Sequence, residues 1–140
     1  MPTSGSSRVV VLDTSAYTRL RRGHDRLADA IAQAERVLLP TIVLGEIEAG
    51  FLLGSRMREN RKSLDDFLSE SFVEVVNVTP AVARRYATTF AALRRAGTPI
   101  PTNDIWIAAC ALENGALVLS FDGDFERVSE LAVTVFSVDG

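Results

Sequence analysis

The feature that most constrains this chain is the apolar run Val9–Leu12, which leads directly into Asp13. Four apolar residues without polar alternation are typical of a strand covered on both faces, the central kind of strand in a parallel sheet. In open α/β sheets, ligands bind at the edge where such strands end. Asp13 is therefore expected at a ligand-binding edge, although an acid in this position is also a common helix cap.

The rest of the chain alternates short apolar runs with helical patterns. Further strands are expected at 37–39, 73–78, 117–119 and 133–138. Helices are expected at 14–23, 25–34, 42–53, 56–70, 80–97 and 103–113, with Thr41 and Thr102 as the caps of the third and the sixth. Strands that alternate with helices in this way predict an α/β fold with a mainly parallel central sheet.

The length of 140 residues predicts a single domain. Residues 1–7 are small and polar, which favours a disordered tail before a domain at 8–140. No apolar run approaches the roughly 20 residues that span a bilayer, so no membrane association is expected. The only cysteine, Cys110, cannot form an internal disulfide, and the cytoplasm is the expected compartment.

The charged residues give a mixed indication about nucleic acid. The net charge of −3 argues against broad, non-specific attraction to a polyanion. The arginines nevertheless fall in clusters, and guanidinium groups suit phosphate recognition, although such clusters are usually solvated helix faces. The clusters are Arg19/Arg21/Arg22, Arg56/Arg58/Arg61, Arg84/Arg85 and Arg94/Arg95.

Three further segments are expected to bring acids to the edge that holds Asp13. Asp122 follows the strand at 117–119, Glu46 lies in the second turn of the helix after the strand at 37–39, and Asp104 lies near the start of its helix. Simpler explanations exist for Asp104 as a first-turn charge and for Asp122 and Asp124 as turn formers. Glu46 is harder to explain in this way, since a carboxylate on an apolar helix face must be paired, protonated or bound to a cation.

No feature near these acids in the sequence plainly supplies an internal partner, since His24 is the only histidine and Lys62 the only lysine. Carboxylates without histidine or cysteine ligands suit Mg²⁺ or Mn²⁺. Two such ions can activate a water and stabilise the leaving oxygen in phosphodiester hydrolysis. Side chains that could orient waters or the acids are Thr14, Ser15, Asn103 and Ser120.

Four segments of the chain resemble the signatures of PIN-domain ribonucleases, and most of all those of the VapC toxins. They are VVLDTS with Asp13, LGEI with Glu46, TNDIWIAA with Asp104, and LSFDGDF with Asp122 and Asp124. The resemblance extends from Arg8 to the final strand. It implies a PIN-like three-layer fold and a Mg²⁺- or Mn²⁺-dependent endoribonuclease that is dimeric and is inhibited by a VapB-type antitoxin.

The resemblance also implies roles for individual residues. Asp13, Glu46 and Asp104 match the acidic triad, with Asn103 beside the third acid. Asp122 is favoured as the fourth acid, because Ser120 stands where a hydroxyl residue is common two positions earlier, and Asp124 is the alternative. The metal ligands are then expected to be Asp13, Asp104 and Asp122, with Glu46 and Asp124 as further candidates.

Two competing functions fit parts of the same pattern. A non-catalytic PIN-like binding module would use the acids only for partner docking. A phosphotransfer or phosphatase domain would also place an aspartate at a strand end, but no DxDxT-like sequence follows the first strand. If RNA is the substrate, Arg19, Arg22 and Arg56 are candidates for contacts beside the acids. The resemblance further implies that helices between Ile42 and Leu68 form the wall of an antitoxin groove.

Overall fold

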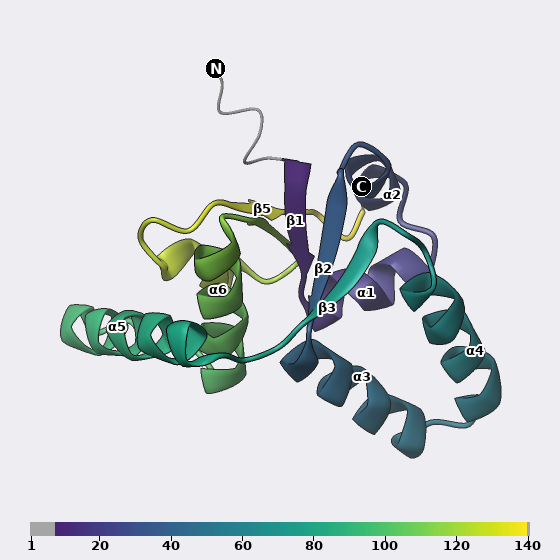
Figure 1. The fold of residues 1–140 in the computed structure, drawn as a ribbon, viewed down its shortest axis with the longest axis horizontal. Coiled ribbons are helices and arrows are strands. Elements are labelled where there is room, and N and C mark those ends of the chain that lie inside the picture. Colours follow the sequence, from purple (N-terminus) through teal and green to yellow (C-terminus); the bar gives the residue numbers. More distant parts are fainter. Residues whose placement is uncertain (1–7, 140) are drawn as a thin grey trace.

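A computed structural model describes residues 8–139 of the chain, so the tail expected at residues 1–7 lies outside the described residues. Within them, five strands form one sheet in the order β3-β2-β1-β4-β5, and every neighbouring pair is parallel (Figure 1). The strands are β1 (Val9–Leu12), β2 (Arg36–Pro40), β3 (Val73–Val76), β4 (Leu117–Ser120) and β5 (Val133–Val135). The parallel α/β fold predicted from the alternating pattern is confirmed.

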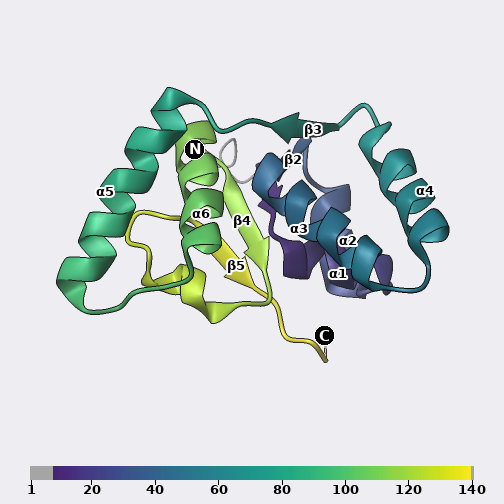
Figure 2. The same ribbon diagram turned by 90° about the horizontal axis from the view of Figure 1, so that it is seen from below.

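Helices cover the sheet on both sides. Figures 1 and 2 show α5 and α6 together on one side, and α1, α2 and α4 on the other. The helices are α1 (Thr14–Arg21), α2 (Asp25–Ala32), α3 (Thr41–Leu53), α4 (Met57–Leu68), α5 (Pro80–Ala96), α6 (Thr102–Asn114) and the short 3-10 helix η2 (Gly123–Arg127). This arrangement confirms the three-layer expectation. Between residues 8 and 139, no helix combines the length and the apolar character needed to cross a membrane.

The core lies along the three central strands. The apolar residues of β1, β2 and β4 are almost completely buried, as expected for strands covered on both faces. Phe125 of η2 is also fully buried and belongs to the same core. Because β1 lies between β2 and β4, the residue that follows it is held at the centre of the sheet's carboxyl edge.

The starts of two helices differ from prediction. Thr41 and Thr102 were expected to cap α3 and α6, but each is the first helical residue, and the caps are Pro40 and Pro101 without a side-chain bond. Proline at the cap loses nothing by lacking an N–H, and its carbonyl still accepts the first helical hydrogen bonds. Thus Pro101 accepts from the backbone N–H of Ile105 at 3.2 Å.

Several element ends also fall short of the predicted bounds. β3 ends at Val76 and β5 at Val135, two and three residues before the predicted ends at 78 and 138, and α4 occupies only 57–68 of the expected 56–70. Both shortened strands lie at the edges of the sheet, where a single neighbour supports them. α5 and α6 end with Gly97 and Gly115 as their C-caps, and both glycines adopt the left-handed conformation that glycine accepts without strain.

Candidate functional site

Asp13 sits at the carboxyl end of β1 and is buried, with 4% of its surface exposed. Its carboxylate accepts hydrogen bonds from the backbone N–H of Ala16 at 2.8 Å, from the Ser120 hydroxyl at 2.6 Å and from the Ser15 hydroxyl at 2.8 Å. Burial raises the pKa of Asp13, and these hydrogen bonds lower it in part. Asp13 is therefore both the N-cap of α1 and an acid held rigidly at the sheet edge.

The two serines join the ends of β1 and β4. The Ser120 oxygen accepts from the backbone N–H of Asp122 at 2.8 Å, and the Ser15 oxygen accepts from that of Phe121 at 3.1 Å. Each hydroxyl thus donates to Asp13 and accepts from the segment after β4. The predicted supporting residues Ser15 and Ser120 lie in contact with the acid, and they fix where Asp122 begins its turn.

Glu46 of α3 is held by neutral donors from two other helices. The Thr14 hydroxyl of α1 donates to one carboxylate oxygen, and the Asn103 amide of α6 donates to the other at 3.2 Å. The face of α3 that carries Glu46 is apolar in sequence but is not buried throughout, since Leu53 is 89% exposed. Glu46 is half-buried, and its hydrogen bonds leave its negative charge uncompensated.

Asp104, Asp122 and Asp124 form the tightest group of acids. One carboxylate oxygen from each lies within 4.8 Å of the others, and all three side chains are partly buried. The pKa of Asp104 is raised to about 7, first by burial and then by the charges of Asp122, Asp13, Glu46 and Asp124, in that order. The five predicted acids therefore share one electrostatic environment.

The structure brings both candidates for the fourth acid to Asp104. Asp122 caps η2, where one of its carboxylate oxygens accepts from the backbone N–H of Asp124 at 2.9 Å, so its turn-forming role is real as well. Asp124 forms an ion pair with Arg127 at 3.2 Å. Arg127 was not among the predicted site residues, and its spacing of three residues after an acid in a helical turn was the available indication.

The remaining reactive side chains are committed to other contacts. In His24, Nδ1 accepts from the backbone N–H of Leu27 and Nε2 lies 2.8 Å from the Ser137 carbonyl. Cys110 is buried, which raises the pKa of its thiol to about 11. Lys62 pairs with Asp66 on α4. These three residues therefore lie in structural contacts away from the acids.

The donor set fits a hard divalent cation. All five acids offer oxygen, which Mg²⁺ and Mn²⁺ prefer. Two oxygens on opposite sides of a Mg²⁺ ion lie roughly 4.2 Å apart, from a bond length of about 2.1 Å. Oxygens within 4.8 Å of one another can reach that arrangement through small side-chain movements. Arg127 is the only basic side chain paired with this group in residues 8–139, so most of its charge is uncompensated.

This protein is an α/β domain with a parallel sheet, and the cluster of carboxylates at the carboxyl edge of that sheet is suited to binding a divalent cation. The sequence profile described as "PIN domain" matches residues 10–131, and the chain belongs to the PIN-domain family.

Curated relatives and solved structures agree with this assignment. Ribonuclease VapC5 of Mycobacterium tuberculosis is 30% identical over 87% of this chain and 89% of its own. The plasmid stability protein StbB of Pseudomonas syringae pv. tomato is 35% identical over 84% of this chain and 91% of its own. The crystal structure of VapBC2 from Rickettsia felis, bound to a DNA fragment from their promoter, contains a chain with a TM-score of 0.82 at 22% identity, covering 92% of this chain and 99% of that one.

Proposed function

We propose that this protein is a metal-dependent endoribonuclease toxin of a VapBC-type toxin–antitoxin system, acting in the cytoplasm. The observation that carries the proposal is the group of Asp104, Asp122 and Asp124, with oxygens within 4.8 Å of one another. Asp13 and Glu46 add charge to the same environment. Membership of the PIN-domain family and similarity to a VapC ribonuclease support the same activity.

Within this proposal, the acidic residues are the ligands of the metal ions. Asp13, Asp104 and Asp122 would hold Mg²⁺ or Mn²⁺, with Glu46 and Asp124 as additional ligands. The bound ions supply an activated water and stabilisation of the leaving oxygen.

The chain's own contribution is orientation. Ser15, Ser120 and the N–H of Ala16 fix both oxygens of Asp13. Thr14 and Asn103 fix Glu46. Because these donors are neutral, they orient the carboxylates but do not neutralise them, so the negative charge remains available to a bound cation.

The test is incubation of the purified protein with total RNA in Mg²⁺ or Mn²⁺, and again with EDTA. We expect cleavage that is abolished by chelation and by Asp13→Asn, while the exposed Asp65→Asn on α4 cleaves like the wild type. Cleavage that survives EDTA or Asp13→Asn would overturn the metal mechanism. If neither ion supports cleavage of any RNA, the remaining function is a non-catalytic PIN-like binding module.

The proposal includes a VapB-type antitoxin that docks against α3 and α4 and places a basic side chain among the acids. The end of α3 and the start of α4 expose Leu52, Leu53 and Met57, with Leu52 71% exposed, which suits an apolar partner surface. Replacing the basic residues of the antitoxin should relieve inhibition, and unchanged inhibition would reject this account. A homodimer is also proposed, and sedimentation at several concentrations tests it.

A further inference from the structure

A cavity of about 720 Å³ lies between α1, α3 and α4, directly beside the acids. Thr14 and Glu46, which are hydrogen-bonded to each other at the site, also line this cavity. Its volume falls within the roughly 300–1,000 Å³ of pockets that hold small ligands. A molecule bound in this cavity would therefore lie directly beside Glu46 of the acidic site.

The cavity is lined by three arginines whose charges are not compensated. Arg21, Arg22 and Arg56 line it, and none of them forms an ion pair with a carboxylate in the part of the chain between residues 8 and 139. Unpaired guanidinium groups around a hollow favour a ligand that carries phosphate or carboxylate.

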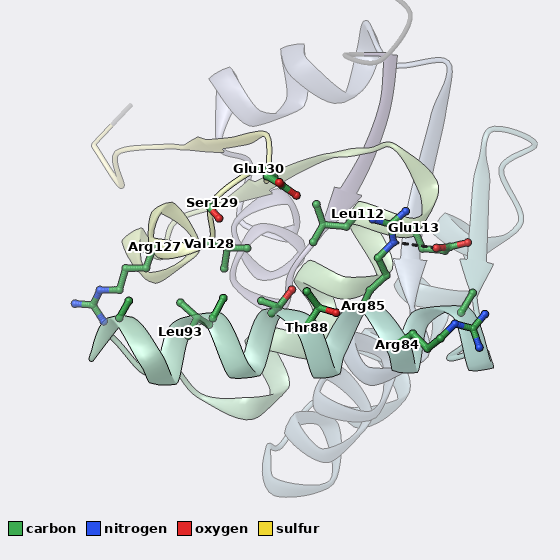
Figure 3. A pocket seen from close by; sticks show the side chains of 14 residues that line it. Arg84, Arg85, Thr88, Leu93, Leu112, Glu113, Arg127, Val128, Ser129 and Glu130 are labelled. Atoms are coloured by element: carbon green, nitrogen blue, oxygen red, sulfur yellow. Dashed lines mark hydrogen bonds and ion pairs between the residues drawn. The ribbon is translucent and has the colours of Figure 1, made fainter.

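A second large hollow, between α5, α6 and the segment that begins at the end of η2, differs in this respect (Figure 3). Two of its three arginines have internal partners: Arg85 pairs with Glu113 at 3.1 Å, and Arg127 pairs with Asp124 at 3.2 Å. The surplus of free positive charge is therefore greater in the cavity beside Glu46.

The wall of that cavity is also arranged in advance of binding. The Arg21 guanidinium lies 5.5 Å from the centre of the Tyr17 ring and 5.7 Å from that of Phe67, so two aromatic rings hold it in place. Tyr17 lines the cavity, and its hydroxyl is buried with no hydrogen-bond partner among the described residues.

From this geometry we infer that the cavity is a binding subsite for the RNA strand next to the cleaved bond, in which Arg21, Arg22 and Arg56 contact backbone phosphate. The inference rests on the proposed ribonuclease function. The five carboxylates repel the phosphates of an RNA strand that lies against them. The positively charged arginines of the neighbouring cavity offset this repulsion. Because Glu46 belongs to both the cavity and the acidic site, the phosphate held by the arginines and the cleaved phosphodiester would be neighbours on one strand.

The structure also separates the arginines that the sequence had grouped. Arg22 and Arg56, both predicted as RNA contacts, line the cavity, whereas Arg19 lies over the Phe121 ring at 5.8 Å and does not line it. Arg21 belongs to the same predicted cluster as Arg19 and Arg22 but was not named among the RNA contacts, and it lies over two aromatic rings of the cavity wall. Arg58 follows Arg56 on α4 but lies outside the cavity lining.

The experiment measures binding of a short, labelled single-stranded RNA by fluorescence anisotropy across a range of salt concentrations. All proteins carry Asp104→Asn, so that bound RNA is not cleaved. Arg22→Gln with Arg56→Gln is compared with the matched pair Arg58→Gln and Arg95→Gln, which removes the same charge from exposed helical positions outside the cavity. Each lost phosphate contact to a single strand reduces the slope of log K against log salt by about 0.7.

We expect the cavity pair to weaken RNA binding and to lower the salt slope by about 1.4, for two contacts, while the control pair changes the slope little. Equal losses in both pairs would overturn the subsite, as would an unchanged affinity in the cavity pair. A cavity pair that keeps RNA affinity but no longer binds the antitoxin would also overturn it and assign the arginines to the protein partner. Cleavage by the protein without these substitutions is scored separately, so failure of the ribonuclease function is distinguishable from failure of the subsite.

Discussion

Replacing Asp104 by asparagine should stabilise the metal-free protein while abolishing its activity. Asp104 lies with two other carboxylates whose oxygens are within 4.8 Å, and burial followed by the charges of its neighbours raises its pKa to about 7. Asparagine has nearly the same shape and carries no charge. The substitution therefore removes an electrostatic cost of folding and leaves the packing of α6 in place.

The magnitude and its sign follow from the pKa of Asp104. The ordinary value is 3.8 and the folded value about 7, and each step of one in pKa corresponds to about 1.4 kcal/mol. Ionising Asp104 at pH 8 thus costs the folded state up to about 4 kcal/mol, or about 2–4 kcal/mol after allowance for solvent screening. Because the folded pKa is the higher one, the folded state binds the proton more tightly. The stability that comes from this tighter proton binding by Asp104 is fully present below about pH 4 and is lost as the pH rises through 7.

Chemical denaturation in EDTA at pH 5 and pH 8 tests this reasoning. The difference in unfolding free energy between Asp104→Asn and the wild type should be larger at pH 8 than at pH 5. Asp13, whose pKa is also raised, is present in both proteins, so its contribution largely cancels. The exposed Asp65→Asn is the control and should show no such difference. An asparagine variant that is no more stable than the wild type at pH 8 would refute the proposed crowding of charge.

Three further predictions concern the metal and the core. Millimolar Mg²⁺ at pH 8 should raise the melting temperature of the wild type, by about 1.4 kcal/mol of stability at ten times the dissociation constant, and should have little effect on Asp104→Asn; no shift with any divalent ion would contradict a metal site. Ser120→Ala removes the donor to Asp13 and the acceptor for Asp122 N–H and should cost about 1–3 kcal/mol in denaturant unfolding, whereas the exposed Ser129→Ala should be neutral. Leu12→Ala, fully buried in β1, should cost about 2–5 kcal/mol, and an equal loss in the exposed Leu53→Ala would contradict the assigned core.

The fold was predictable because its central strands are unusually uniform. Val9–Leu12 and Leu117–Leu119 have no polar alternation, and both are buried neighbours in the sheet. Such runs define which strands are central, and the helices between them require parallel pairing. Edge strands carry a weaker pattern, since one side of each is open, and this is where the predicted ends at 78 and 138 were too long.

The convergence of the acids was also predictable, but their hydrogen-bond partners were only partly so. Position at strand ends and helix starts sufficed to bring together Asp13, Glu46, Asp104 and Asp122, because every crossover in a parallel sheet returns to the same edge. Thr14, Ser15, Asn103 and Ser120 were expected to support them, but which acid each contacts depends on how α1, α3 and α6 pack. Arg127 was missed although its spacing of three residues after Asp124 indicated the contact, because the pairing of the two side chains was not considered when the acids were assigned to the site.

The two explanations of Asp13, as helix cap and as functional acid, turn out to depend on each other. Capping α1 requires a carboxylate oxygen facing the N–H of Ala16, and that contact turns the group toward Ser120 on the neighbouring strand. Burial opposes the charged form, while three hydrogen bonds favour it. The Ser120 bond also fixes the orientation of Asp13 relative to Asp122, which begins its own turn from the same hydroxyl, as a shared role of the two acids would require.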